Sequence, residues 1–361
     1  MKITFLIGNG FDLNLGLDTT YNSFLKHYLK DTANDSDVIK EFKSKIQQDL
    51  DCWACAELAF GKITSHFQNT SEEVQNFSNC HIDFCEHLAE YFRFQEKRID
   101  YKKNKDLIEK AFCTSLSKCD LGLREEQRNN LKNLVTSQGS NIEFNFINFN
   151  YTNTLDNFVK LIDNTESMKL ITFQKMSFYN TIGKIYHVHG TTEKDMVFGV
   201  NDESQITNLK LFEGQQEVFK NQLIKRETNK MYEERIDEKV FDVLKNSHLI
   251  YIFGMSIGKT DADWWNNISR LLAKNFTLHV IIQAMDVPKN ELIRVKFVQF
   301  ENSIRSRFVN FLGLGNEAKD SIKTRIHVVG ENIFDGFTQF VSKQENYQEH
   351  NNSNPNNKES A

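Results

Sequence analysis

The chain has 361 residues, of which 44 are Lys or Arg and 49 are Asp or Glu, so its formal net charge is −5. An acidic chain without a basic tail has no general electrostatic attraction for nucleic acid, although a local groove that binds RNA or DNA is not excluded. Hydrophobic residues make up 39% and charged residues 26%. This composition excludes a disordered chain and predicts a packed core.

The first predicted element is a strand over residues 3–7, which ends at Gly8-Asn9-Gly10 and is followed by a helical pattern. A short apolar start that runs into a glycine turn is not typical of a signal peptide. The longest apolar runs are far shorter than the roughly 20 residues that span a bilayer. We therefore expect a cytoplasmic protein that does not bind membranes.

A helical insertion is predicted over residues 36–140, because apolar residues such as Val38, Phe42 and Ile46 recur at helical spacing. The insertion contains one C-x-x-C motif, Cys52 to Cys55. No second C-x-x-C follows it, and the motif lies within a helical pattern. We therefore expect no structural zinc.

Short apolar runs return after the insertion and predict further strands. They cover residues 144–149, 185–189, 196–200, 249–254, 278–282 and 325–329. Strands separated by helices are typical of a doubly wound, mainly parallel Rossmann-like sheet. We expect this α/β core to comprise residues 1–35 and 141–342, and the polar residues 343–361 to form a disordered tail.

The glycine turn at residues 8–10 is a candidate phosphate site, because backbone N–H groups at the start of a helix suit an anion. It lacks the third glycine of the dinucleotide fingerprint, since Leu13 occupies that position. A tight turn without a ligand explains the pattern equally well. Asp12 would repel a phosphate, so we expect it to cap the helix or to face a ribose hydroxyl or a metal ion.

Two polar residues are the candidate catalytic groups. Asn150 follows a predicted strand, where ligands bind in open α/β sheets, and its amide can hold a water or a hydroxyl. It could also be an ordinary turn residue. His189 is the stronger candidate, because an imidazole titrates near neutral pH and can act as a general base. His187 lies two residues earlier and would point to the same side of a strand.

The opening of the chain resembles the bacteriophage abortive infection family AbiH. The similar stretch is I-G-N-G-F-D-L-N-L-G-L-D-T-T-Y-N-S-F at residues 7–24. Residues 149–155, 186–190, 198–199 and 253–256 look like later motifs of that family, in the same order. The resemblance implies a role in phage defence, in which a phage-derived trigger would act on the protein.

A more remote similarity is to sirtuin-type NAD-binding domains. Their glycine turn, asparagine loop, His-Gly pair and Gly-x-Ser loop are matched here by residues 8–10, Asn150, His189-Gly190 and residues 254–256. The likeness implies a sirtuin-like core that binds and cleaves a nucleotide, with NAD the first candidate and with Asn150 and His189 as catalytic residues. The expected nucleotide contacts are Gly8, Asn9, Gly10, Asp12, Tyr21, Tyr151, Gly190, Gly254, Ser256 and Asp261.

The departures from the sirtuin pattern argue against deacetylation. Paired C-x-x-C motifs are missing, and Phe149 stands where the sirtuin loop has a glutamine. Two other functions stay open. One is a metal-dependent nuclease that acts on RNA or DNA, in which Asp12, His187 and His189 hold a metal or exchange protons. The other is a noncatalytic nucleotide sensor that signals to a partner through the insertion. The sequence also leaves open whether the protein forms a homo-oligomer.

Overall fold

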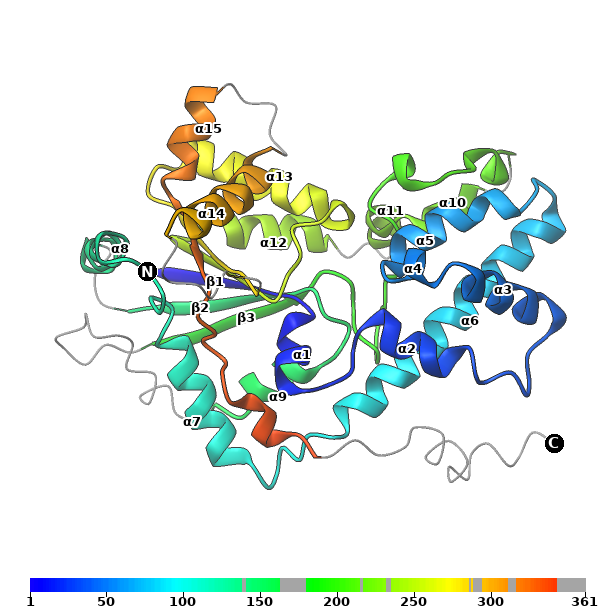
Figure 1. The fold of residues 1–361 in the computed structure, drawn as a ribbon, viewed down its shortest axis with the longest axis horizontal. Coiled ribbons are helices and arrows are strands. Elements are labelled where there is room, and N and C mark those ends of the chain that lie inside the picture. Colours follow the sequence, from blue (N-terminus) through cyan, green and yellow to red (C-terminus); the bar gives the residue numbers. More distant parts are fainter. Residues whose placement is uncertain are drawn as a thin grey trace.

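The computed structural model describes residues 1–137, 141–162, 180–214, 217–231, 235–285, 287, 294–310 and 316–342. The tail predicted over residues 343–361 lies outside this range. The protein is a mixed α/β structure around one six-stranded sheet in which every neighbouring pair is parallel. The strand order is β3-β2-β1-β4-β5-β6. The expected parallel α/β sheet is therefore confirmed (Figure 1).

The strands are β1 (Lys2–Ile7), β2 (Glu143–Asn148), β3 (Thr181–His187), β4 (Leu249–Phe253), β5 (His279–Gln283) and β6 (Ile326–Val329). The strand predicted over residues 196–200 was wrong, because Val200 makes only an isolated bridge with Ile224. The helices between β1 and β2 are α1 (Gly10–Leu15), α2 (Tyr21–Tyr28), α3 (Asp37–Gln48), α4 (Leu50–Trp53), α5 (Ala56–Ile63), α6 (Ser71–Glu96), α7 (Lys105–Leu116) and α8 (Glu125–Ser137).

The later described helices follow β2, and most of them cover the sheet. They are α9 (Thr154–Lys160), α10 (Glu217–Leu223), α11 (Lys225–Met231), α12 (Ile236–Lys245), α13 (Ala262–Lys274), α14 (Arg294–Val309) and α15 (Asn316–Lys323). In the central strands β1 and β4, apolar side chains point to both faces of the sheet. One face packs against α1, α7, α8 and α9, and the other packs against α12 to α15. Strands buried on both faces in this way read as nearly continuous apolar runs.

Aromatic rings fix the central register of the sheet. Phe5 lies opposite Phe146 on one side and Tyr251 on the other. Its ring centroid is 5.6 Å from that of Phe146 and 5.3 Å from that of Tyr251. Aromatic pairs at this spacing contribute beyond their buried area. Aromatic packing thus joins β1 to β2 and to β4, the strands at whose ends the cleft described below lies.

A second body, here called the helical lobe, is formed by α2 to α6 together with residues 196–214 and 217–231 (Figure 1). The segment predicted as a single insertion divides between two places, because α3 to α6 join this lobe whereas α7 and α8 pack on the sheet. Phe60 and Phe84 in the lobe both contact Phe198, which comes after β3. The lobe is therefore built from segments that are distant in sequence.

Candidate functional site

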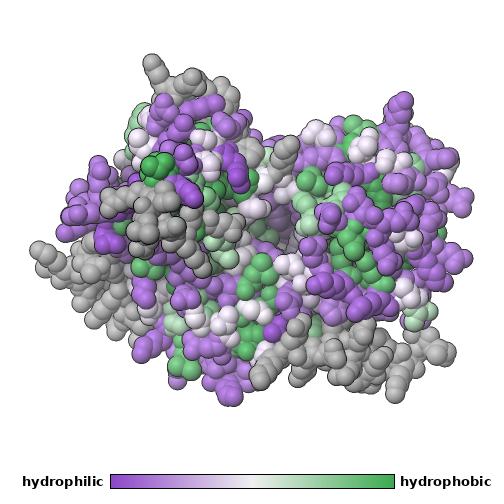
Figure 2. Space-filling model, viewed as in Figure 1, coloured by the Kyte–Doolittle hydropathy of each residue, from purple (hydrophilic) through white to green (hydrophobic). Residues whose placement is uncertain are grey.

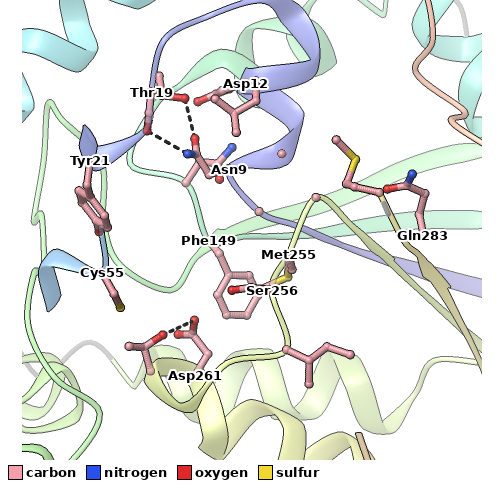
Figure 3. Close-up of a pocket in the computed structure, with 18 of the residues that line it drawn as sticks. Asn9, Asp12, Thr19, Tyr21, Cys55, Phe149, Met255, Ser256, Asp261 and Gln283 are labelled. Carbon is pink, nitrogen blue, oxygen red and sulfur yellow. Dashed lines mark hydrogen bonds between the residues drawn. The ribbon is translucent and has the colours of Figure 1, made fainter. Parts of the chain in front are cut away.

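A cleft of about 680 Å³ lies at the carboxyl ends of β1, β2, β4 and β5, where the sheet meets the helical lobe. Figure 2 shows the surface hollowed between these two bodies, and Figure 3 shows the side chains that surround the opening. Segments far apart in the sequence meet here. Of the predicted site residues, the structure brings together Gly8, Asn9, Gly10, Asp12, Tyr21, Asn150, Tyr151, His189, Gly254, Ser256 and Asp261.

The glycine turn after β1 is packed against the turn after β4. The N–H of Gly8 donates to Phe253 O at 2.9 Å, and that of Gly10 donates to Gly254 O at 2.8 Å. The N–H of Phe11 donates back to Gly8 O. A Cβ on Gly10 would lie 2.3 Å from the Cα of Gly254. The glycines therefore allow the backbones of the two turns to pack in contact. The three N–H groups donate to carbonyls, so they are not available to bind a phosphate as expected.

Two other predicted nucleotide contacts, Asn9 and Gly190, have structural roles. Asn9 Nδ2 donates to Thr19 O at 2.9 Å, and Thr19 Oγ1 donates to Asn9 Oδ1 at 2.6 Å (Figure 3). The Asn9 side chain thus holds the loop before α2. Gly190 is not among the residues that line the cleft. Its φ is 65°, and a Cβ there would lie 1.8 Å from Asp195 O, so glycine is required for a tight turn.

Asp12 is fully buried at the floor of the cleft. Its Oδ2 accepts a 2.6 Å hydrogen bond from Thr152 Oγ1, whereas its Oδ1 has no hydrogen-bond partner among the described residues. Burial raises the pKa of Asp12 to about 7, although Thr152, Thr154 and Asn150 each act to lower it. The side chain does not cap α1, because that helix has no side-chain cap.

Asn150 lies beside Asp12 and is also buried. Its backbone N–H donates to Asn148 Oδ1 at 3.0 Å, so β2 itself sets the direction of the loop. Neither Nδ2 nor Oδ1 of Asn150 has a hydrogen-bond partner among the described residues. Buried amides are rarely left in this state without a water or a ligand.

His189 is held by a buried ionic network. Its Nε2 lies 3.2 Å from Asp261 Oδ1, and the same oxygen lies 3.3 Å from Lys225 Nζ. Lys225 Nζ also lies 3.1 Å from Glu57 Oε2. Burial would raise the pKa of Asp261, but Lys225 and His189 outweigh it and hold that pKa well below its usual range. Asp261 is therefore a carboxylate at neutral pH.

The network continues into the helical lobe through two tyrosines. Tyr151 OH donates to Glu57 Oε1 at 3.2 Å, and Tyr21 OH donates to the same oxygen at 3.3 Å. Burial lowers the pKa of Lys225, but Asp261 and Glu57 outweigh it and raise that pKa overall. Neither Glu57 nor Lys225 is marked by a clear signal in the sequence. Glu57 is a single charged residue in an apolar stretch, and Lys225 begins a run of charged residues with Arg226 and Glu227 that is typical of an exposed helix.

The three residues of the nuclease alternative are not brought together. His187 Nε2 pairs with Asp156 Oδ2 at 2.8 Å, and His187 does not line the cleft that contains Asp12 and His189. Across the described part of the chain, no group of three or more His, Cys, Asp or Glu side chains is arranged to hold a metal ion.

The structure thus defines an α/β protein with a cleft of ligand size, lined by both polar and apolar side chains, at the carboxyl edge of a parallel sheet. The family model for bacteriophage abortive infection AbiH matches residues 4–282. The chain belongs to the AbiH family, which confirms the resemblance and implies a role in abortive infection. None of the curated proteins matches the chain. Within the described segments, no helix has the length and apolar character needed to cross a membrane.

Proposed function

We propose that the cleft binds a nucleotide, with NAD the first candidate, and that the protein cleaves it during phage defence. The observation that carries this proposal is the meeting of Asn150 and His189, which come from distant segments, in one cleft. Each has a buried polar side-chain atom without a hydrogen-bond partner in the described structure. A bound ligand would supply the partners that such atoms require.

The topology supports the same proposal. The order 3-2-1-4-5-6 is that of doubly wound dinucleotide-binding sheets, and ligands bind such sheets where the strand order reverses, beyond the carboxyl ends. Here the reversal falls between β1 and β4, and the turns after both strands line the cleft. Its volume is also within the range of about 300–1,000 Å³ found for small-molecule sites. A sirtuin-like arrangement is part of this proposal.

The chemistry follows from the partners of His189. An ionised Asp261 can only accept hydrogen bonds, so His189 Nε2 carries a proton, and in the neutral imidazole Nδ1 is then the nitrogen with the lone pair. That geometry makes Nδ1 the basic atom, as in other carboxylate–histidine pairs. The Asn150 amide can both donate and accept, which suits it to orient a water molecule.

In this reaction the water oxygen forms a bond to C1′ of the nicotinamide ribose. The glycosidic bond breaks, its electron pair goes to the pyridine nitrogen, and nicotinamide and ADP-ribose are released. His189 takes the proton that the water loses, or holds a ribose hydroxyl during the step. No other reactant is needed.

The test is mass analysis of products after the purified protein is incubated with cellular nucleotides, RNA and DNA, with and without phage lysate. NAD should be lost, and His189→Ala and Asn150→Ala should each abolish turnover and phage protection while the protein stays folded. The double variant should lose little more, since members of a catalytic unit are not additive. His187→Ala is the matched control, because His187 lies outside the cleft and pairs with Asp156.

Three results would contradict the proposal. Full protection by folded His189→Ala would end the catalytic assignment. Loss of RNA or DNA while NAD stays intact would favour a nuclease. Stable nucleotide binding without any product under all trigger conditions would favour a sensor.

A further inference from the structure

We infer that Asp12, Asn150 and Thr154 form a binding site for a monovalent metal cation, Na⁺ or K⁺, at the floor of the cleft. The site does not depend on the proposed nucleotide chemistry. It rests on buried oxygen atoms that have no partner in the described structure. Asp12 and Thr154 are fully buried and Asn150 is 5% exposed.

The unsatisfied oxygens come from two adjacent segments of the fold. They are Asp12 Oδ1 on α1, Asn150 Oδ1 in the loop after β2, and Thr154 Oγ1 at the start of α9. Thr154 and Asn150 both lie near enough to the Asp12 carboxylate to lower its pKa, although neither side chain makes a hydrogen bond to it in the described structure. The unpartnered oxygens of Asn150 and Thr154 therefore lie near a carboxylate whose Oδ1 is also without a partner. Leaving them without a partner would cost several hydrogen bonds.

The charge of this region also requires a partner. Asp12 has no ion pair with Lys, Arg or His within the described residues, and burying the ionised form of a carboxylate without a cation is strongly unfavourable. Glu96 adds to the negative potential. Burial raises the pKa of Glu96 to about 7, the N–H of Asn153 acts against this, and Asp12 raises it further.

The donor set indicates the kind of cation. Carboxylate, amide and hydroxyl oxygens are hard ligands, which suit alkali and alkaline-earth ions and not the metals that prefer sulfur or imidazole. One carboxylate in the inner set supplies one negative charge. A single positive charge neutralises it, whereas Ca²⁺ sites are usually built with several carboxylates.

The site is open to the cleft, because Asp12 and Asn150 line it. Figure 3 shows Asp12 beside the opening. The described lining also includes the carboxylates of Glu57 and Asp261. If the cleft holds a nucleotide as proposed, a cation at Asp12 would remove a repulsion between this carboxylate and the phosphates.

The test measures thermal unfolding of the full chain without nucleotide at pH 8 in KCl, NaCl or choline chloride of equal ionic strength. Choline is too large to enter such a site. Na⁺ or K⁺ should raise the midpoint saturably, by about 3 °C or more at saturation. Asp12→Asn should remove the difference between the salts.

Asp83→Asn is the matched control, because Asp83 accepts a 2.6 Å hydrogen bond from Tyr28 in the helical lobe and should keep the cation effect. Thr154→Val provides a second variant if Asp12→Asn does not fold, and it should weaken the effect. Identical midpoints in all three salts would overturn the inference, and so would an unchanged cation effect in Asp12→Asn. Stabilisation by Mg²⁺ or Ca²⁺ alone would overturn the assignment to a monovalent ion.

Discussion

Replacing Lys225 by Met should destabilise the protein more than any other single loss of a lysine charge in its helix. Lys225 is 5% exposed, and its Nζ lies 3.1 Å from Glu57 and 3.3 Å from Asp261. Methionine keeps an unbranched side chain of similar length but removes the charge. Two carboxylates in a buried setting would then lose their shared cation.

Removing one partner of a buried ion pair costs about 3–5 kcal/mol, because the remaining charge stays buried without compensation. We expect a loss of this size for Lys225→Met, since Asp261 keeps His189 as a partner but Glu57 keeps only two tyrosine hydroxyls. The folded state raises the pKa of Lys225, so the native state binds this proton more tightly. The stabilisation is therefore fully present below pH 10.5 and is lost as the pH rises through the folded value.

The assay is urea denaturation at pH 7, with Lys230→Met as the matched control on the same helix. Lys230 pairs with Glu227 at 2.7 Å, but its side chain is 59% exposed. Exposed pairs contribute about 0.2–1 kcal/mol, so this variant should change little. The reasoning would be refuted if Lys225→Met lost no more free energy of unfolding than Lys230→Met.

Three further predictions test other parts of the structure. In choline chloride, the stability of the wild type relative to Asp12→Asn should fall by up to about 4 kcal/mol between pH 4 and pH 7, because the pKa of Asp12 rises from 3.8 to about 7 on folding. Urea denaturation of both proteins across this range measures the difference, and a difference that does not change with pH would contradict the reasoning. Gly10→Ala should cost about 1–3 kcal/mol by overpacking against Gly254. In Gly258→Ala the added Cβ comes no closer than 3.5 Å to a neighbour, so equal denaturation midpoints for these two variants would disprove the packing argument. Asn9→Ala should lower the thermal midpoint through loss of two hydrogen bonds, and an unchanged midpoint would show that they contribute nothing.

The sheet could be predicted from sequence because its strands are buried on both faces. Residues 3–7, 249–254 and 278–282 are nearly unbroken apolar runs, and they correspond to β1, β4 and β5 within a residue or two. The run at 196–200 has the same composition but is buried in the helical lobe and bridges only to residue 224. Apolar composition predicts burial in both cases, but it does not say which partner buries the segment.

In the candidate site too, some residues could be predicted from the sequence and others could not. Asn150 was predicted from its position after a strand and His189 from its imidazole and its His-Gly context, and the structure brings both to one cleft. Glu57 and Lys225 were not predicted, because their contact joins residues 168 positions apart. The carbonyls that accept from the N–H groups of Gly8 and Gly10 could not be predicted from the sequence either. They depend on how closely the turn after β4 approaches Gly8 and Gly10.

The hydrogen bonds of the glycine turn limit which groups in the cleft can recognise a ligand. Because the N–H groups of Gly8, Gly10 and Phe11 are bound to carbonyls, we expect selectivity to depend largely on side chains such as Asp12, Asn150 and His189. The last of these is linked to the helical lobe, because Lys225 of α11 reaches Asp261 on the sheet side. Moving the lobe away from the sheet would separate this buried ion pair. A ligand or partner that opens the cleft must therefore supply that free energy by binding the open state more tightly than the closed state.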